Sequence, residues 1–500
     1  MMRKVTSVFW YSLGICLAVV IWGSIAPENL ESFTTKMTNL LSKDFGWFYL
    51  LSVIIMLVFC VLLMFSRYGH VKLGKADDKP EFSLMSWFAM LFSAGMGMGL
   101  VFWTTAEPIS HAFTNSPGAE LGSDEAIKDA LKYSFFHWGI HAWAVYGVVG
   151  LVLAYFKFHQ GALGLISSTL VPVFGKKRME GGLGMEGGLG KWVDILAVFA
   201  TVVGVAATLG FGSAQITSGL SFLIGTPDTF AVQLLILAVS TALFIWSAWS
   251  GIGKGIKYLS NINMGLASVL LVLLFIVGPT LYILNMFTHT LGTYLTDFFR
   301  MSLRIGPLNE ERRAWIHDWT IFYWAWWISW SPFVGIFIAR ISKGRTVKEF
   351  LFGVLFVPAL VCFIFFSVFG VSALNLEQNG IAKISELSVE TSTFGVLAEY
   401  PLGTTMSVIT VFVVAIFFIT SADSATFVLG MLSTKGSLNP ANSVKILWGL
   451  AQAALAAIIV YFGGTQGLQN MLIIAALPFT IVVLLMGISF LKAVRKEYKP

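Results

Sequence analysis

Four tryptophans lie within seven residues of an apolar segment that runs from Trp324 to Trp330. The face of an indole is electron-rich, so several indoles around a small cavity attract a cation without N–H donors, typically a quaternary ammonium. On a helix, Trp326 and Trp327 lie on or near the face that carries Trp330. Trp324 points away from that face, so its ring must pack elsewhere. The run therefore predicts either a cation cage flanked by packing rings or a cluster that only packs.

A second aromatic face lies earlier in the chain. Trp138, Trp143 and Tyr146 fall within a helical arc of about 140°. His137 and His141 belong to the same segment and are four residues apart, a spacing that suits two metal ligands on one helix face. No carboxylate or cysteine stands beside them in the sequence. Hydrogen bonds to neighbouring helices are therefore the favoured interpretation, with a metal site as the alternative.

A third group offers oxygen atoms. Thr420 and Ser421 are adjacent hydroxyls in an apolar segment, and Asp423 follows them. An ionisable residue inside a membrane span is by default a candidate functional residue. The alternative for Asp423 is a capped or paired structural carboxylate near the inner membrane face.

A glycine run, Gly95, Gly97 and Gly99, opens the segment that leads to Glu107. Each glycine costs a helix roughly 1 kcal/mol relative to alanine, and unwound backbone at membrane depth is tolerated only where it lines protein or a watery cavity. Such a break exposes carbonyls for a cation and N–H groups for an anion. The alternative is close helix packing through the pair Gly95 and Gly99. Pro332 predicts a second interruption, in the middle of the tryptophan segment.

The composition places these groups in a membrane. Hydrophobic residues make up 57% of the 500 residues, charged residues only 12%, and the mean hydropathy is +0.80. These values exclude an ordinary soluble domain and indicate an all-α polytopic membrane protein. Apolar runs of about 20 residues predict twelve transmembrane helices. Their ranges are 7–25, 47–66, 84–106, 133–156, 192–213, 229–250, 262–286, 318–340, 348–374, 404–433, 443–462 and 470–491.

Basic residues predict the orientation. Most of the 32 Lys and Arg residues fall in segments that are cytoplasmic if the N-terminus is inside. Both termini are then expected in the cytoplasm of a multi-pass plasma-membrane protein. The basic excess is explained by topology, so we expect no nucleic-acid partner.

The two interrupted spans, the third and the eighth, are five spans apart. Two five-helix units that each begin with a broken helix are typical of inverted-repeat symporters, in which the substrate binds between the repeats. We therefore expect two peripheral helices in 1–80, a first repeat in 81–286 and a second in 318–495. Segment 287–317 would join them through an amphipathic helix near 290–300 on the outer surface.

The runs Gly95–Gly99, Phe136–Trp138, Trp324–Gly335 and Thr420–Ser424 together resemble the betaine/carnitine/choline transporter family over essentially residues 1–495. The resemblance implies a LeuT-like secondary active transporter that imports glycine betaine, an osmoprotectant, by sodium symport through alternating access. It also implies a homotrimer, and no cofactor besides sodium as the coupling ion.

The resemblance assigns roles to particular residues. The substrate would bind at Trp138, Trp143, Tyr146, Trp326, Trp327, Trp330, Gly97 and Gly99. The main sodium site would use Ser93, Met96, Phe417, Thr420 and Ser421. A second sodium site would use Thr201 and the region of Phe333. Val205 stands where that second site has a threonine in sodium-coupled members, which leaves the sodium stoichiometry open.

The substrate is chosen by charge. Glycine betaine has a trimethylammonium for the cage and a carboxylate for the free N–H groups of the unwound third span. Choline lacks the carboxylate, and choline transporters of the family tend to carry an aspartate where this chain has Gly99. Choline, carnitine, ectoine and proline betaine remain alternatives, as do proton coupling and exchange. An ion channel needs no tryptophan cage. A membrane enzyme would need paired acids, bases or a metal cluster, and the seven histidines are scattered apart from the pair His137 and His141.

Overall fold

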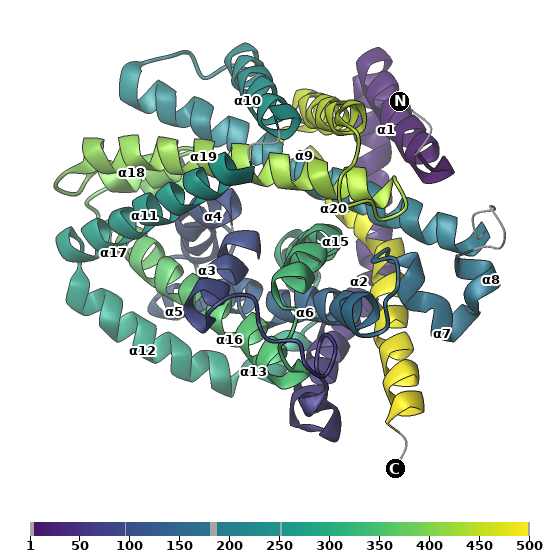
Figure 1. Ribbon diagram of the computed structural model, residues 1–500. Coiled ribbons are helices and arrows are strands. Elements are labelled where there is room, and N and C mark those ends of the chain that lie inside the picture. Colours follow the sequence, from purple (N-terminus) through teal and green to yellow (C-terminus); the bar gives the residue numbers. More distant parts are fainter. Residues whose placement is uncertain (1–4, 96, 181–187, 251–252, 499–500) are drawn as a thin grey trace.

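The computed structural model describes residues 5–95, 97–180, 188–250 and 253–498 (Figure 1). Within these ranges the regular secondary structure is helical, apart from one isolated antiparallel bridge between Lys72 and Thr346. The α-helices are α1 Ser7–Ile25, α2 Pro27–Phe65, α3 Leu84–Gly95, α4 Met98–Ile109, α5 Asp124–Trp138, α6 Ile140–Ala154, α7 Val171–Phe174, α8 Lys176–Met179, α9 Gly188–Ile224, α10 Phe230–Ser250, α11 Gly253–Val277, α12 Thr280–Thr296, α13 Phe298–Ser302, α14 Glu310–Trp315, α15 Phe322–Ile341, α16 Val347–Phe365, α17 Val371–Gln378, α18 Ser392–Ala398, α19 Gly403–Leu432 and α20 Asn442–Glu497. Short π or 3₁₀ segments are η1 Arg67–His70, η2 Ser110–Thr114, η3 Tyr155–His159, η4 Ser167–Leu170, η5 Ile316–Ile321, η6 Phe366–Gly370 and η7 Ile384–Glu386.

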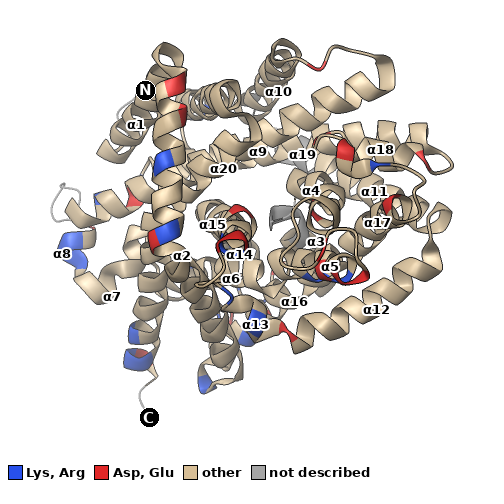
Figure 2. Cartoon of the chain, turned by 180° about the vertical axis from the view of Figure 1, so that it is seen from behind, with Lys and Arg blue, Asp and Glu red and all other residues tan. Residues whose placement is uncertain are grey.

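In the described part of the chain, ten helices are long and apolar enough to cross a membrane. The predicted third span is absent from this set because it is divided into α3 and α4, each 12 residues long. The predicted eleventh and twelfth spans both lie in α20, which has 56 residues and non-helical backbone at Gly464. Most charged residues lie near helix ends and in connections, although several lie along α2 (Figure 2). Most of the length of the other long helices is free of them. The chain is therefore a multi-pass, all-helical membrane protein.

One of the two most enclosed spans contains the tryptophan run. In Glu310–Ile341, which includes α15, and in Asp124–His159, 94% of the residues in the apolar stretch are buried, whereas the share in α1 is 33%. Figure 1 shows α15 nearly end-on in the middle of the molecule, with α6 beside it. Helices α6, α9 and α20 pack against α15. Side chains on α15 are therefore positioned by protein on several sides.

The predicted break in the third span is confirmed. Helix α3 ends at Gly95 and α4 begins at Met98, with Gly97 in a non-helical conformation at φ −102° and ψ −128°. Met96 lies outside the described residues. A second break, at Gly139 between α5 and α6, was not predicted. A Cβ on Gly139 would lie 2.4 Å from the Phe135 carbonyl oxygen, so only glycine fits this bend without a shift.

The predicted interruption at Pro332 is wrong, because α15 runs unbroken through this residue. Pro332 has no N–H for the carbonyl of Ile328 four residues earlier. The hydroxyl of Ser331 donates to that carbonyl at 2.7 Å instead. A neighbouring side chain thus replaces the missing backbone donor, and the helix continues.

The segment between the seventh and eighth predicted spans also differs from expectation. Helix α11 ends at Val277 rather than near 286, because Gly278 and Pro279 follow. The next helix, α12, occupies Thr280–Thr296 and ends at Asp297. The predicted surface helix near 290–300 is therefore the end of α12 together with the short α13.

Candidate functional site

Three rings of α15 form a stack. The planes of Trp326 and Trp327 are 8° apart with centroids at 5.3 Å. Tyr323 is stacked at 5.8 Å from Trp327 and at 6.3 Å from Trp326. All three side chains are buried. The helix thus presents a wall of aromatic faces rather than separate rings.

Trp138, the last residue of α5, closes one side of this wall. Its ring lies edge-on to Trp327 at 4.9 Å and to Trp326 at 6.2 Å. The indole N–H of Trp327 donates to the backbone carbonyl of His137 at 2.9 Å. The break at Gly139 therefore places the end of α5 directly against α15. The sequence contains Gly139, but no pattern around this residue predicted a bend.

The other predicted cage residues lie at different distances from the stack. Tyr146 of α6 is 6.2 Å from Trp327, and Trp143 contacts Tyr146 at 5.5 Å. Trp330 instead packs edge-on against Phe333, and its indole N–H donates to the carbonyl of Gly204 on α9 at 2.9 Å. Trp330 thus ties α15 to α9.

Trp324 takes no part in the stack of Tyr323, Trp326 and Trp327, as the sequence predicts. Its ring stacks on His141 at 5.6 Å and lies edge-on to Phe136 at 5.2 Å. The Nε2 atom of His141 is hydrogen-bonded to the Ser302 hydroxyl at 2.8 Å. Hydrogen bonding, the favoured interpretation of His141, is what the structure contains.

The glycine break meets the aromatic wall. A Cβ on Gly99 would lie 2.9 Å from Trp326 Cη2 and 3.4 Å from Trp138 Cη2. Real Cβ atoms are rarely so close to a ring atom, so a side chain at this position would displace the indole. Gly99 therefore lets the start of α4 lie directly beside two of the predicted cage rings.

The same break lies beside the hydroxyl pair of α19. A Cβ on Gly97 would be 3.3 Å from the Ser421 hydroxyl oxygen and 3.6 Å from the Phe417 ring. Thr420 donates to the carbonyl of Ile416 at 2.8 Å. Of the predicted main sodium ligands, Phe417 and Ser421 are thus next to the break, and Thr420 precedes Ser421 in α19. Ser93 lies near the end of α3, and Met96 is outside the described residues.

The predicted second sodium site has fewer free side-chain oxygens than the main site. The Thr201 hydroxyl donates to the Ala197 carbonyl of its own helix at 2.8 Å. Val205 is buried one turn further along α9, next to the Gly204 carbonyl that accepts from Trp330.

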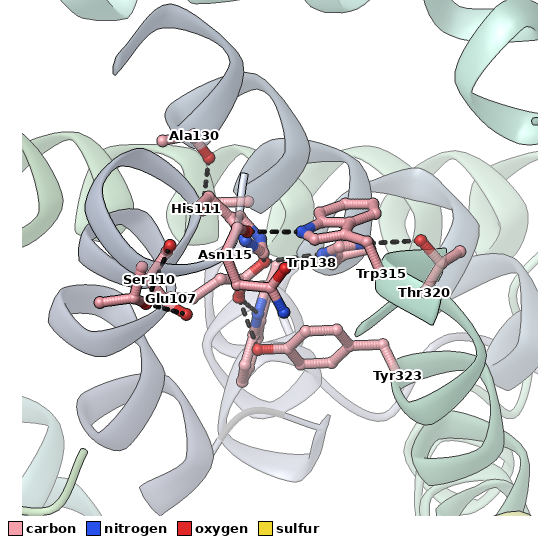
Figure 3. Close-up of polar contacts among 12 residues, drawn as sticks. Glu107, Ser110, His111, Asn115, Ala130, Trp138, Trp315, Thr320 and Tyr323 are labelled. Atoms are coloured by element: carbon pink, nitrogen blue, oxygen red, sulfur yellow. Dashed lines mark hydrogen bonds and ion pairs between the residues drawn. The ribbon is translucent and has the colours of Figure 1, made fainter. Parts of the chain in front are cut away.

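A buried carboxylate that was not singled out as a site residue lies behind the cage rings. Glu107 of α4 is fully buried, and both of its oxygens accept hydrogen bonds (Figure 3). Oε2 accepts from the Trp138 indole at 2.9 Å and from the Tyr323 hydroxyl at 2.5 Å. Oε1 contacts His137 Nδ1 at 2.7 Å and His111 Nε2 at 3.3 Å. In the sequence, this buried carboxylate is visible as a single glutamate within an apolar segment.

Glu107, His111 and His137 bring three metal-ligating atoms within 4.8 Å of one another. Glu107 is 30 residues away from His137 in the sequence, so the sequence alone placed no carboxylate beside this histidine. The four hydrogen bonds already use both carboxylate oxygens, and His137 Nε2 is bonded to the Thr320 hydroxyl at 3.0 Å. Hydrogen bonds therefore account for the positions of these groups.

Comparison with known proteins identifies the family. The sequence profile of the betaine/carnitine/choline family transporters matches residues 7–499. The chain belongs to this family. It is 54% identical to the glycine betaine transporter OpuD of Bacillus subtilis, covering 99% of this chain and 96% of that protein. It is 42% identical to the ectoine/hydroxyectoine transporter of Virgibacillus pantothenticus, with 98% and 97% covered. It is also 37% identical to the betaine/ectoine transporter LcoP of Corynebacterium glutamicum, with 98% and 79% covered.

Three buried polar atoms of the predicted cage residues have no hydrogen-bond partner within the described residues. They are the Tyr146 hydroxyl and the indole N–H groups of Trp143 and Trp326. Buried polar atoms of this kind are usually completed by water or by a ligand.

Proposed function

We propose that this chain imports glycine betaine by sodium symport through alternating access. The observation that carries the proposal is the position of Gly99 between the rings of Trp138 and Trp326. Gly99 lies in the first turn of α4, directly after the non-helical Gly97. Here N–H groups without intrahelical partners meet aromatic faces, which attract a quaternary ammonium. A zwitterion with a trimethylammonium and a carboxylate fits both. The name of the Bacillus relative supports betaine as the substrate.

Ectoine is the second candidate, because two of the relatives are named ectoine transporters. Like betaine, it is a zwitterion: it pairs a positive group, here a delocalised amidinium, with a carboxylate. Choline and carnitine come after it. Choline has no carboxylate for the N–H groups that flank Gly99.

Uptake of labelled betaine tests the proposal. In membrane vesicles with an inward sodium gradient, we expect labelled glycine betaine to accumulate above its outside concentration. Unlabelled betaine should compete fully, ectoine partly and choline weakly. Replacing sodium by potassium on both sides should abolish accumulation. Accumulation that persists without sodium, or stronger competition by choline than by betaine, would contradict the proposal.

We further propose that both termini lie in the cytoplasm of a plasma-membrane protein, from the distribution of Lys and Arg. The homotrimer is likewise a proposal, supported by the family alone.

Cysteine labelling is expected to confirm this orientation. Lys177 is exposed in the helix α8, on the side proposed to be cytoplasmic, and Leu308 is fully exposed in the segment proposed to be outside. All three native cysteines are buried, so the background is low. A cysteine at position 308 should react with an impermeant maleimide on intact cells, and one at 177 should react only after lysis. The reverse pattern would invert the topology.

A further inference from the structure

Glu107 has an unusual set of partners for a carboxylate inside a membrane protein. Its four hydrogen-bond contacts come from α4–η2, α5 and α15, and each oxygen has two. A carboxylate is an acceptor with about four lone-pair positions when ionised, and loses one of them when protonated. The indole of Trp138 can only donate. The ionised form therefore satisfies all four contacts.

The two imidazoles need no extra proton to complete this arrangement. With Nδ1–H donating to Glu107, a neutral His137 has a free lone pair on Nε2, which accepts from the Thr320 hydroxyl. Neutral His111 donates through Nε2, and its Nδ1 has no partner among the described residues. With both rings neutral, the group carries one negative charge.

Among the described residues, no lysine or arginine pairs with Glu107, and its ion-pair contacts are those with His111 and His137. Buried charges in proteins are normally paired, because an unpaired one is costly in a low-dielectric interior. A cation that enters the neighbouring aromatic site would supply the missing partner.

We propose that Glu107 is the counter-charge of the cage and determines its preference for a quaternary ammonium over an uncharged group of the same shape. This inference rests on the proposed substrate. Glu107 acts through two rings: it fixes the Trp138 indole and the Tyr323 phenol through their polar hydrogens. Donation to an anion also enriches the electron density of both rings. Both rings contact Trp327, so the negative charge lies directly behind the aromatic wall. Glu107 is thus a positioning and specificity residue.

A pair of isosteric ligands separates charge from shape. In 3,3-dimethylbutanoate a carbon replaces the quaternary nitrogen of glycine betaine, so the molecule keeps the shape and the carboxylate but loses the positive charge. We expect Glu107→Gln to weaken betaine binding about 10-fold in purified protein. Binding of 3,3-dimethylbutanoate should stay unchanged or tighten, because the fixed negative charge no longer opposes it. The ratio of the two affinities should fall about 10-fold or more.

Matched variants decide between charge and packing. Tyr323→Phe removes one donor but keeps the charge, so the affinity ratio should stay within about threefold of the wild type. Glu107→Asp also keeps the charge and should retain the ratio even if both affinities decline. Glu377→Gln changes a carboxylate of α17 that accepts from the backbone N–H and the hydroxyl of Ser385, and serves as the control.

The outcomes are distinct. Equal losses for both ligands in Glu107→Gln, with an unchanged ratio, would show a purely structural role and overturn the inference. If Glu107→Gln does not fold, loss of the ratio in Glu107→Asp would overturn it, and retention would support it. Wild-type protein that binds no betaine would instead refute the proposed function and leave the charge of Glu107 to be probed with another cation.

Discussion

Replacing Trp327 by leucine is expected to weaken betaine binding roughly 30-fold, because one cation–π contact at a desolvated site is worth about 2 kcal/mol. Trp327 is the ring with the most partners in the site. It contacts Trp138, Tyr323 and Trp326, and it lies within 6.2 Å of Tyr146. Equilibrium binding to purified, detergent-stable protein is the measurement.

Trp324→Leu is the matched control. The two rings belong to the same helix, and both are nearly fully buried, at 1% exposed for Trp324 and 2% for Trp327. The two substitutions therefore remove similar packing, and similar losses of thermal stability are expected. Trp324 stacks on His141, whereas Trp327 stacks on Tyr323 and Trp326. Betaine affinity should change less than about threefold in this variant. Equal, small effects of both substitutions would return the tryptophan run to a packing role.

The features that could be predicted from sequence are those written locally in the chain. Apolar run length indicated a polytopic helical protein, and the alternate glycines predicted the break at Gly97. Helical geometry separated Trp324 from Trp326, and in the structure Trp324 lies outside the stack that contains Trp326 and Trp327. Each of these inferences needs only the period of a helix or the conformational cost of a residue.

The features that were missed depend on contacts between distant segments or on compensation by a neighbour. The proposed role of Glu107 depends on its hydrogen bonds with Trp138 and Tyr323, which belong to other helices. The bend at Gly139 is stabilised by packing against α12, whose Tyr294 hydroxyl would be 2.9 Å from an added Cβ. At Pro332 the rule about proline was sound, but the Ser331 hydroxyl supplies the missing hydrogen bond. A single sequence does not show which residue of another segment will contact a given side chain.

The assignment of Trp330 illustrates the same limit within one helix. Helical position placed it on the face of Trp326, yet its indole donates to Gly204 of α9. A shared face gives direction only, and the neighbouring helix decides what a side chain on that face contacts. Trp330 is accordingly a candidate for coupling α15 to the helix that contains Thr201 and Val205.

The largest functional effect is expected from the sodium gradient. Betaine carries no net charge, so each sodium ion that accompanies it moves one positive charge inward. That charge gains about 2.3 kcal/mol per 100 mV of membrane potential. A tenfold sodium gradient adds about 1.4 kcal/mol per ion. One sodium ion can therefore sustain a betaine gradient of roughly 500-fold, and two ions roughly the square of that.

The side chains favour one firmly bound ion. Thr420 and Ser421 lie on α19, and Ser421 is adjacent to the glycine break, where unwound backbone offers further oxygens. At the other candidate position the side chain of Val205 has no oxygen, and the hydroxyl of Thr201 is bonded to Ala197. We therefore expect one sodium per betaine. The reversal potential of purified protein in proteoliposomes, with set sodium and betaine gradients, measures this ratio.

Two variants make this measurement specific. Ser421→Ala removes the hydroxyl beside Gly97 and should raise the sodium concentration for half-maximal uptake about 10-fold or more, because a cation in a desolvated site loses one of its few ligands. Ser407→Ala, on the same helix α19, removes an equally small hydroxyl from a buried position outside the proposed site and should leave the sodium dependence unchanged.

A reversal potential that follows protons instead of sodium would reject sodium coupling and point to Asp423. A two-sodium ratio would mean that Thr201 turns its hydroxyl away from Ala197 and finds other oxygens during transport, with Thr208, two turns further along α9, as the nearest hydroxyl on that helix to test.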